Sequence, residues 1–331
     1  MRSAFDHFTP DLILDAIEEG TGRKLTGLTA PLPSYINRVY ELQTVDGEKL
    51  IAKFYRPGRW ERAAIEDEHD FVLDCAAVEI PVVAPFELAT GSTIGEHEGV
   101  LYSVFPKRSG REMELRDEES WLRLGRLVGR VHQAGWERDA ENRLRMHPET
   151  TTIPEIDGLL ESGFMGRGQA DRFKDVTSRI VEKALRAFEG IELQRVHGDC
   201  HRANILERPD EGLMVIDFDD MVMGPAVQDI WLLLPGHASD TRREIGLILE
   251  GYEQFMEFDE RQLRLIEILR AMRIIYFLSW CGTQSDDYKF RTNFPDWGSD
   301  AFWNREIADL ERQHQAILND ERFNGGAFNE Y

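Results

Sequence analysis

Three polar side chains lie close together in the second half of the chain, and their types are those that phosphoryl transfer requires. Asp199 and Asn204 fall five residues apart within residues 197–204, and Asp217 follows thirteen residues later, at the end of an apolar segment. A kinase uses one carboxylate to orient and deprotonate the attacking hydroxyl, and oxygen ligands to hold Mg²⁺ on the nucleotide phosphates. The spacing therefore predicts Asp199 and Asp217 as catalytic residues, with Asn204 and Asp217 as the metal ligands.

The chain between Asn204 and Asp217 has the pattern of a β-hairpin. Residues 204–206 and 213–216 supply two short, largely apolar arms, and the turn formers of residues 208–212 lie between them. Such a hairpin returns Asp217 to the side of Asn204. Because Mg²⁺ binds one or two carboxylates together with phosphate oxygens and water, these two side chains suffice for a metal site.

Two other interpretations of this region stay open. His197, Cys200 and His201 are potential zinc ligands, because zinc takes nitrogen and sulfur in a tetrahedral set. Against this, Cys75 and Cys281 are isolated, and no Cys-x-x-Cys pair occurs. The polar residues could also serve only to cap turns. Neither interpretation explains why three of them fall at the spacing of a kinase.

A nucleotide-binding region is expected in the first hundred residues, where the pattern is rich in strands. Two strands are predicted at residues 37–42 and 49–55, around the turn at residues 45–48. The preceding loop, residues 33–37, is where a kinase covers the phosphates with a glycine-rich turn, yet it contains no glycine. Ser34 or backbone amides would have to contact the nucleotide instead. Neither a P-loop nor a dinucleotide-binding fingerprint is present.

Lys53 lies among apolar neighbours in the second of these strands. In a kinase, such a lysine reaches the α- and β-phosphates and is positioned by a glutamate from a nearby helix. The helix expected at residues 63–76 offers Glu66 and Glu68, of which Glu68 is favoured. The alternative is a lysine that extends to solvent from a strand edge.

The distribution of elements predicts an α+β, bilobal protein-kinase-like fold. Residues 1–105 would form the N-terminal ATP-binding lobe, with an antiparallel sheet and helices, of which the first is capped by Thr9. Residues 106–331 would form a larger, mainly helical lobe for catalysis and substrate binding. Its expected helices cover residues 119–134, 170–188, 242–256, 260–280 and 301–318.

Two further features of this second part have structural consequences. Gly125 and Gly129 are expected to permit close approach of another helix, and His132 would end the helix that contains them as a structural residue. Asp229 is placed either to bond the backbone of the catalytic loop or to cap a turn. The apolar run at residues 274–281 is too short to span a membrane and is expected to pack in the core.

Composition limits the partners and the compartment. The 331 residues include 39 basic and 61 acidic ones, a formal net charge of −22, which disfavours nucleic acids and anionic membranes. The three scattered cysteines give no disulfide framework, and the N-terminus lacks the apolar stretch of a signal peptide. We therefore expect a cytoplasmic protein, and nothing in the sequence requires more than a monomer.

Several sequence strings resemble a known family. The motifs His-Gly-Asp-x-His-x-x-Asn and Ile-Asp-Phe-Asp resemble those of the aminoglycoside phosphotransferase and choline kinase group within the protein-kinase-like fold. A closer similarity, to the bacterial stress response kinase A family, covers most of the chain. It is carried by residues 34–40, 53–60, 197–201, 224–229 and 269–273.

The resemblance implies an ATP- and Mg²⁺-dependent serine/threonine protein kinase of the bacterial cytoplasm that protects cells under stress. It implies Asp199 as proton acceptor, Asn204 and Asp217 as magnesium ligands, and Ser34 at the ATP site. The residues themselves leave the acceptor open, because a small-molecule kinase acting on an amine, amino acid or sugar hydroxyl fits equally well. A pseudokinase that only binds partners is disfavoured, since the polar residues expected of an active site are all present. They are Lys53, Asp199, Asn204 and Asp217.

Two features bear on regulation and on the acceptor. Gly198 replaces the arginine of the usual His-Arg-Asp loop, and only seven residues separate Asp217 from Pro225, so activation by phosphorylation at residues 218–224 is not expected. Residues 285–300 interleave aromatic and acidic side chains. These could bind a cationic small molecule or could simply be packing and solvated surface.

Overall fold

The chain folds into two compact units in the computed structural model. The residues that this structure describes are 5, 8–34, 36–208, 211–285 and 288–327. The first unit comprises residues 1–114, 133–143 and 201–221, and the second comprises residues 115–132, 144–200 and 222–331. Each unit is assembled from separate stretches of chain, whereas the sequence predicts one lobe boundary after residue 105. That boundary stays a prediction.

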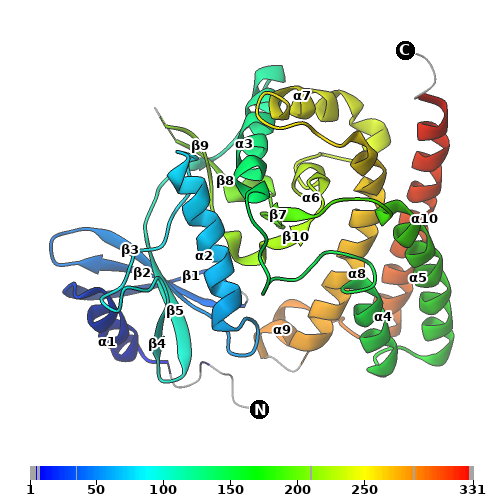
Figure 1. Cartoon of the computed structure of the whole chain (residues 1–331). Helices are drawn as coiled ribbons and strands as arrows, with labels where there is room; N and C mark the ends of the chain where they lie inside the picture. The colour runs from blue at the N-terminus through cyan, green and yellow to red at the C-terminus, as the bar shows by residue number, and fades with distance from the viewer. Residues whose placement is uncertain (1–4, 6–7, 35, 209–210, 286–287, 328–331) are drawn as a thin grey trace. The chain divides into compact units, whose positions relative to one another are not determined.

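The first unit contains a five-stranded antiparallel sheet in the order β1-β2-β3-β5-β4 (Figure 1). Its strands are β1 (Leu25–Leu32), β2 (Arg38–Thr44), β3 (Lys49–Phe54), β4 (Gly95–His97) and β5 (Val100–Pro106). Helices α1 (Pro10–Thr21) and α2 (Arg62–Ala77) each share a hydrophobic cluster with residues of this sheet region. Thr9 caps α1 as predicted, because its hydroxyl accepts a hydrogen bond from Leu12 N at 3.3 Å.

Strand β3 decides which way Lys53 points. Successive side chains of a strand face opposite sides of the sheet. Leu50, Ala52 and Phe54 belong to the hydrophobic cluster that includes α1, so Lys53 lies on the other face. On that face Tyr55 packs with Ile65 of α2, which is the helix that carries Glu68. The alternation therefore directs Lys53 toward α2.

A second, three-stranded sheet in this unit carries the predicted hairpin. Its strands are β6 (Arg111–Glu112), β8 (Ile205–Arg208) and β9 (Gly212–Val215), in the order β6-β8-β9. Ile205 pairs with Val215, and Ile216 N donates to Asn204 O at 3.0 Å. The hairpin is confirmed, and Asp217 directly follows the residue that is bonded to Asn204. Pro209 and Asp210 of the expected turn lie outside the described residues.

The second unit is mainly helical. Its longer helices are α3 (Glu118–Trp136, of which residues 133–136 fall in the first unit), α4 (Thr152–Glu161), α5 (Arg167–Phe188), α7 (Arg242–Tyr252), α8 (Ile266–Gln284) and α10 (Asp300–Ala327). Shorter elements are α6 (Val227–Trp231), α9 (Tyr288–Asn293) and a two-stranded antiparallel sheet of β7 (Gln194–Val196) and β10 (Val222–Gly224). Short 3₁₀ turns occupy Ala238–Asp240 and Glu260–Leu265 in this unit, and Arg202–Asn204 and Phe218–Asp220 in the first unit.

The glycines of α3 allow close helix packing, as expected. A Cβ atom on Gly125 would lie 1.9 Å from Ile248 O, and one on Gly129 would lie 2.6 Å from Tyr252 O. Both carbonyl groups belong to α7. Any side chain at either position would therefore force the two helix backbones apart.

One strand was not predicted, and two sequence-based expectations need correction. Strand β1 contains Gly27 and Pro31, which disfavour regular strands; it forms as an edge strand with a register shift between Leu25 and Thr29. His132 does not end its helix, which continues to Trp136. The apolar run in α8 is only partly in the core, since Tyr276 and Phe277 are exposed.

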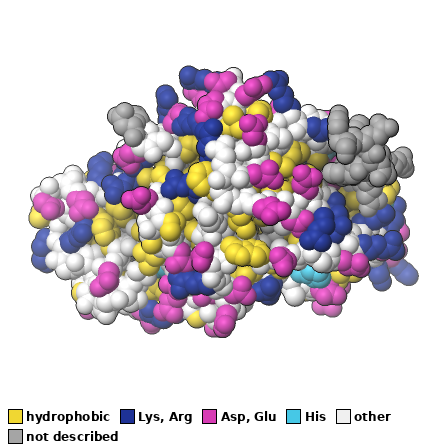
Figure 2. Space-filling view, turned by 45° about the horizontal axis from the view of Figure 1, so that its top comes forward, with side chains coloured by type: hydrophobic (Ala, Val, Ile, Leu, Met, Phe, Trp, Pro, Cys, Tyr) yellow, Lys and Arg dark blue, Asp and Glu magenta, His cyan; other side chains and the backbone are white. Residues whose placement is uncertain are grey.

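The surface is mixed in charge. On the face drawn in Figure 2, acidic side chains are interspersed with basic ones and with smaller apolar areas. Cys75, Cys200 and Cys281 are free thiols and are buried, which agrees with the absence of a disulfide framework. Within the part of the chain that the structure describes, no helix is long and apolar enough to cross a membrane.

Candidate active site

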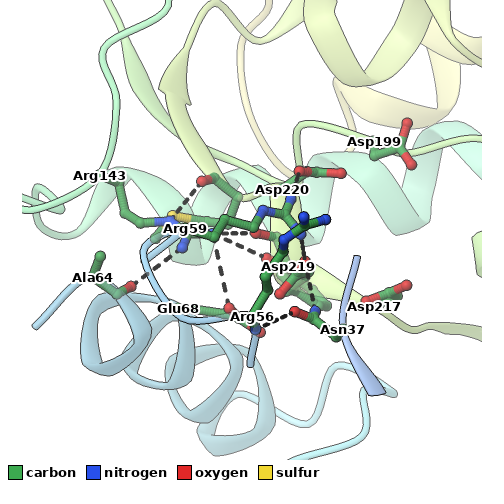
Figure 3. A network of polar contacts seen from close by, with 12 residues as sticks. Asn37, Arg56, Arg59, Ala64, Glu68, Arg143, Asp199, Asp217, Asp219 and Asp220 are labelled. Carbon is green, nitrogen blue, oxygen red and sulfur yellow. Dashed lines mark hydrogen bonds and ion pairs between the residues drawn. The ribbon is translucent and has the colours of Figure 1, made fainter. Parts of the chain in front are cut away.

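Lys53 is the centre of a cluster of charged side chains in the first unit. Its partners Glu68, Asp217 and Asp219 are labelled in Figure 3. Its Nζ lies 2.8 Å from Asp219 Oδ1, 3.5 Å from Asp217 Oδ1 and 3.7 Å from Glu68 Oε1. The structure therefore brings together three residues that were predicted for the site, Lys53, Glu68 and Asp217. It adds Asp219, which makes the shortest of the three contacts. The alternative of a lysine extending to solvent is wrong, because Lys53 is only 8% exposed.

Asp219 is held from a second side by residues that follow β1 and β3. Arg59 forms an ion pair with Asp219 Oδ2 and reaches Asp220 Oδ1 at 2.6 Å. Asn37 Nδ2 donates to Asp219 Oδ2 at 3.2 Å, while Asn37 Oδ1 accepts from Arg56 N at 3.1 Å. Asp219 is 7% exposed, so both of its oxygens are committed to partners inside the protein. Asp217, by contrast, has a side chain that is 59% exposed.

Arg143 joins α2 to the segment that follows Asp217. Its guanidinium donates to Met221 O at 2.8 Å and to Asp219 O at 2.6 Å, and it lies 3.8 Å from Glu68 Oε2. It also stacks over the Trp60 ring at 4.1 Å. The side chain is fully buried. Backbone and side-chain acceptors thus share one buried cation, which fixes the glutamate and the 218–221 segment together.

The cluster shifts the titration of its members in opposite directions. Burial opposes charge on Lys53, but Asp219, Glu68 and Asp217 outweigh it and hold the pKa of Lys53 well above its ordinary value. Burial raises the pKa of Glu68 to about 7, against the opposing effect of Lys53. Burial also acts on Asp219, but Lys53 and Arg59 outweigh it and lower the pKa of Asp219 to about 2. The closest carboxylate is therefore the charged partner of Lys53.

The expected metal ligands have suitable chemistry and surroundings. Asp217 has a left-handed backbone, with φ of 63°, two residues after the end of the hairpin strand β9. The amide oxygen of Asn204 and the carboxylate of Asp217 are the hard oxygen donors that Mg²⁺ takes, and phosphate oxygens and water would complete its coordination. Ser34 lies exposed in the loop between β1 and β2, where the phosphate-covering turn was expected. Tyr35 in the same loop lies outside the described residues.

In the second unit, Asp229 holds the loop that precedes Asp199. Asp229 Oδ2 accepts from His197 N at 2.7 Å, and Oδ1 accepts from Gly198 N at 2.9 Å. The prediction that Asp229 bonds the catalytic loop is confirmed. Gln228 adds a third bond, since its Nε2 donates to Gly198 O at 2.9 Å. Strand β7 leads into this loop and pairs with β10, which fixes the N-terminal end of the loop.

Asp229 is itself positioned by His132 of α3. His132 Nε2 lies 3.0 Å from Asp229 Oδ2, and His132 Nδ1 lies 3.1 Å from the hydroxyl of Tyr252 on α7. His132 and Tyr252 are fully buried. His132 therefore has the structural role that was expected, in a chain of hydrogen bonds that ends on the loop backbone.

The zinc interpretation of the loop is not supported by the arrangement of its candidate ligands. Cys200 is buried, and this burial, reinforced by Asp229 and Asp199, raises the pKa of its thiol well above the ordinary value. His197 accepts a hydrogen bond at Nδ1 from Asp199 N, at 3.3 Å. Among the described residues, no group of three or more His, Cys, Asp or Glu side chains is arranged to hold a metal ion.

Asp199 itself pairs with an arginine of α8. Asp199 Oδ1 accepts a hydrogen bond from Arg273 Nη2 at 2.7 Å.

The aromatic side chains at residues 285–300 pack on one another. Phe290 stacks on Phe294 with centroids 4.8 Å apart, and Trp297 packs against Phe302. These rings pack on one another, which favours the packing interpretation. Asp286 and Asp287 lie outside the described residues.

Several residues of these clusters were not predicted. They are Asn37, Arg59, Arg143 and Asp219 in the first unit, and Gln228 and Arg273 in the second. The second acid of the Ile-Asp-Phe-Asp motif was a visible signal for Asp219. Arg59 and Arg273 lie in strings that carried the family resemblance but were given no role. Arg143 belongs to no motif, so no local pattern indicated it.

Comparison with known proteins identifies the family. Residues 29–266 match the model of the phosphotransferase enzyme family. Stress response kinase A of Escherichia coli (strain K12) is 37% identical over 326 residues, which is 96% of each chain. Serine/threonine protein kinase RdoA of Salmonella typhimurium (strain LT2) is 36% identical over 314 residues, covering 95% of this chain and 94% of that protein.

Solved structures agree on the fold. Amicoumacin kinase hAmiN, in complex with AMP-PNP, Ca²⁺ and Ami, superposes with a TM-score of 0.72 at 19% identity and covers 95% of this chain and 94% of its own. Spectinomycin phosphotransferase gives a TM-score of 0.65 at 12% identity, over 94% of this chain and 98% of its own. The fold is therefore protein-kinase-like. The family match and the kinase relatives show that the enzyme is a phosphotransferase with a hydroxyl acceptor. The chain belongs to the stress response kinase A family within the phosphotransferase enzymes.

Proposed function

We propose that this protein is an ATP- and Mg²⁺-dependent serine/threonine protein kinase. The observation that carries the proposal is the assembly around Lys53, whose ammonium lies within 3.7 Å of Glu68 and 3.5 Å of Asp217. A lysine positioned by a helix glutamate beside an exposed aspartate is the arrangement by which kinases hold nucleotide phosphates.

Each residue then has a chemical task. Lys53 neutralises phosphate charge, Glu68 and Asp219 fix the lysine, and Ser34 contacts the phosphates from the β1–β2 loop. Asn204 and Asp217 hold Mg²⁺, which when bound withdraws charge from the phosphoryl oxygens. Asp199 orients the acceptor hydroxyl and takes its proton as the new phosphorus–oxygen bond forms. Asp229 and Gln228 hold the backbone that carries Asp199.

The acceptor class is the finer part of the proposal. Relatives that match over nearly their whole length bear the names stress response kinase A and serine/threonine protein kinase, which supports a protein hydroxyl as acceptor and a role in survival under stress. We place the enzyme in the bacterial cytoplasm, where ATP is available. A small-molecule hydroxyl is the competing acceptor, and the experiment below separates the two.

We further propose that the kinase needs no phosphorylation after Asp217. Residues 218–224 contain no Ser, Thr or Tyr. The conformation of this segment is stabilised by Arg143 and Arg59, which form hydrogen bonds and an ion pair with residues 219–221. Fixed cations of the chain thus replace the phosphate contacts that order activation loops in regulated kinases.

Transfer of label from ATP tests the proposal. The purified protein and its Asp199→Asn variant are incubated with Mg²⁺ and γ-labelled ATP, with and without dephosphorylated casein, and label is mapped on the protein. We expect phosphoserine or phosphothreonine, reduced about 10²- to 10⁴-fold in Asp199→Asn. Asp175→Asn, at an exposed position of α5, is the matched control and should keep full activity. Label in small molecules of a cell extract, with none in protein, would contradict the acceptor class but not the phosphotransfer.

A further inference from the structure

Two arginines one turn apart on α8, Arg270 and Arg273, have different partners. Arg270 makes structural contacts outside the loop of Asp199. Its Nη2 donates to Gly236 O at 2.8 Å, and its guanidinium lies over the Trp231 ring at 4.9 Å. Arg273 forms its ion pair with Asp199, at 2.7 Å. Its side chain is 41% exposed, so burial of apolar surface does not account for its place. Of the two, Arg273 is the one directed at the catalytic loop.

The arginine nearest to Asp199 in the sequence, Arg202, pairs with Glu112 at 3.3 Å. Residues 197–201 contain neither lysine nor arginine, and Gly198 occupies the place of the arginine in His-Arg-Asp loops. A carboxylate that must present one oxygen to an acceptor hydroxyl needs its other oxygen fixed, because rotation about its side-chain bonds would misplace the base. The guanidinium of Arg273 donates to Oδ1 and thereby restricts this rotation.

We infer that Arg273 is a positioning residue for phosphoryl transfer, which acts by holding Asp199 Oδ1. The inference rests on the proposed role of Asp199 as the base. Because the transition state of phosphoryl transfer is loose, the base contributes mainly by orienting the hydroxyl, and orientation is what this ion pair controls. The proton of the hydroxyl still goes to Asp199, while Arg273 keeps its charge and proton throughout.

A double-mutant cycle tests the inference. Asp199→Asn, Arg273→Ala and the combined variant are compared with wild type, with Mg²⁺ and γ-labelled ATP, by label in protein and by release of inorganic phosphate. Arg273→Ala is expected to lower kcat about 10- to 100-fold with KM for ATP unchanged. Arg273→Lys should recover part of this loss, and millimolar guanidinium should partly rescue Arg273→Ala. In the combined variant, kcat should be no lower than in Asp199→Asn.

The control is Arg270→Ala, which removes contacts of the fold. It should lower the thermal unfolding temperature, should not be rescued by guanidinium, and should add its effect to that of Asp199→Asn. The inference is overturned if the losses of Arg273→Ala and Asp199→Asn multiply, or if Arg273→Ala keeps the wild-type kcat. If Asp199→Asn itself keeps the wild-type rate, the proposed base and the inference both fail. If wild type labels no protein, only the proposed acceptor class fails, and the cycle is read from phosphate release.

Discussion

In the first unit, Lys53 is held by side chains that are themselves charged, whereas in the second unit the loop before Asp199 is held through its backbone. Glu68, Asp219 and Arg143 are buried and balance one another around Lys53. In the second unit, the Asp229 carboxylate instead accepts hydrogen bonds from two neutral backbone N–H groups. Removal of one member in the first cluster therefore leaves an unpaired buried charge, while removal in the second mainly leaves unsatisfied hydrogen bonds. The two kinds of loss differ in size and in their dependence on pH.

The largest effect is expected for Arg143→Met, which deprives Glu68 of a cation and several backbone carbonyls of a donor. The free energy of unfolding should fall by about 3–5 kcal/mol, the cost of breaking a buried ion pair from one side. Urea unfolding at neutral pH measures the change. Arg138→Met is the matched control, because Arg138 pairs with Asp70 and Asp74 but is half exposed, and it should cost no more than about 1 kcal/mol. Equal losses in the two variants would refute the comparison.

A smaller loss is expected for Asp229→Asn, which replaces two acceptor oxygens by one. One backbone N–H of His197 or Gly198 then loses its partner, at a cost of about 1–3 kcal/mol. Hydrogen exchange of these two amides should become faster, and kcat should fall with it. Asp259→Asn serves as control, because Asp259 also accepts from a backbone N–H, that of Arg261, but at a more exposed helix cap. Since Asn caps helices as well as Asp does, this variant should be nearly neutral.

The pH dependence of stability in Asp219→Asn tests the charged character of the first cluster. The pKa of Asp219 is lowered from 3.8 to about 2 in the folded state, so its ionised form stabilises the fold above pH 4, and this contribution is lost as pH falls through 2. We expect wild type to exceed Asp219→Asn by roughly 2 kcal/mol at pH 7, and the difference to shrink on acidification. Urea unfolding of both proteins between pH 7 and pH 3 measures it. A difference that stays constant over this range would show that the ion pair contributes nothing.

Glu68→Gln should give an effect of similar size, with the opposite dependence on pH. The pKa of Glu68 is raised from 4.5 to about 7, so its contribution to stability is complete below pH 4.5 and is lost as pH rises through 7. Relative to Glu68→Gln, wild type should therefore lose roughly 2 kcal/mol between pH 5 and pH 8. The same unfolding experiment tests this. A parallel course of the two stability curves would contradict it.

The parts that the sequence predicted well are those with a local pattern. The cap at Thr9 and the hairpin that returns to Asp217 each follow from residue types at short spacing. The bond from Asp229 to His197 spans 32 positions and was one of two alternatives that the sequence left open. Lys53 and Glu68 were also paired correctly, because the alternation of β3 and the helix that follows limit the choice.

The rest depended on contacts between distant segments. Arg143 bonds mainly to backbone carbonyls, and a carbonyl has the same appearance in every sequence, so no pattern of residue types indicates such a partner. Arg273 lies 74 positions from Asp199, and its distinction from Arg270 is set by which side of α8 meets the loop. Strand β1 is not indicated by residue preferences, because it contains Gly27 and Pro31, which an edge strand tolerates and a central strand does not.

The left-handed backbone of Asp217 has a consequence for how variants at this position sort. Asn and Gly adopt a φ of 63° at little cost, whereas β-branched and bulky residues are strained there. In a screen that scores protein abundance and enzyme output separately, Asp217→Asn should be abundant and inert, and Asp217→Val or Asp217→Ile scarce. A population that acquires asparagine at this codon would thus carry a normally expressed, silent enzyme, and loss of function would leave no trace in expression levels.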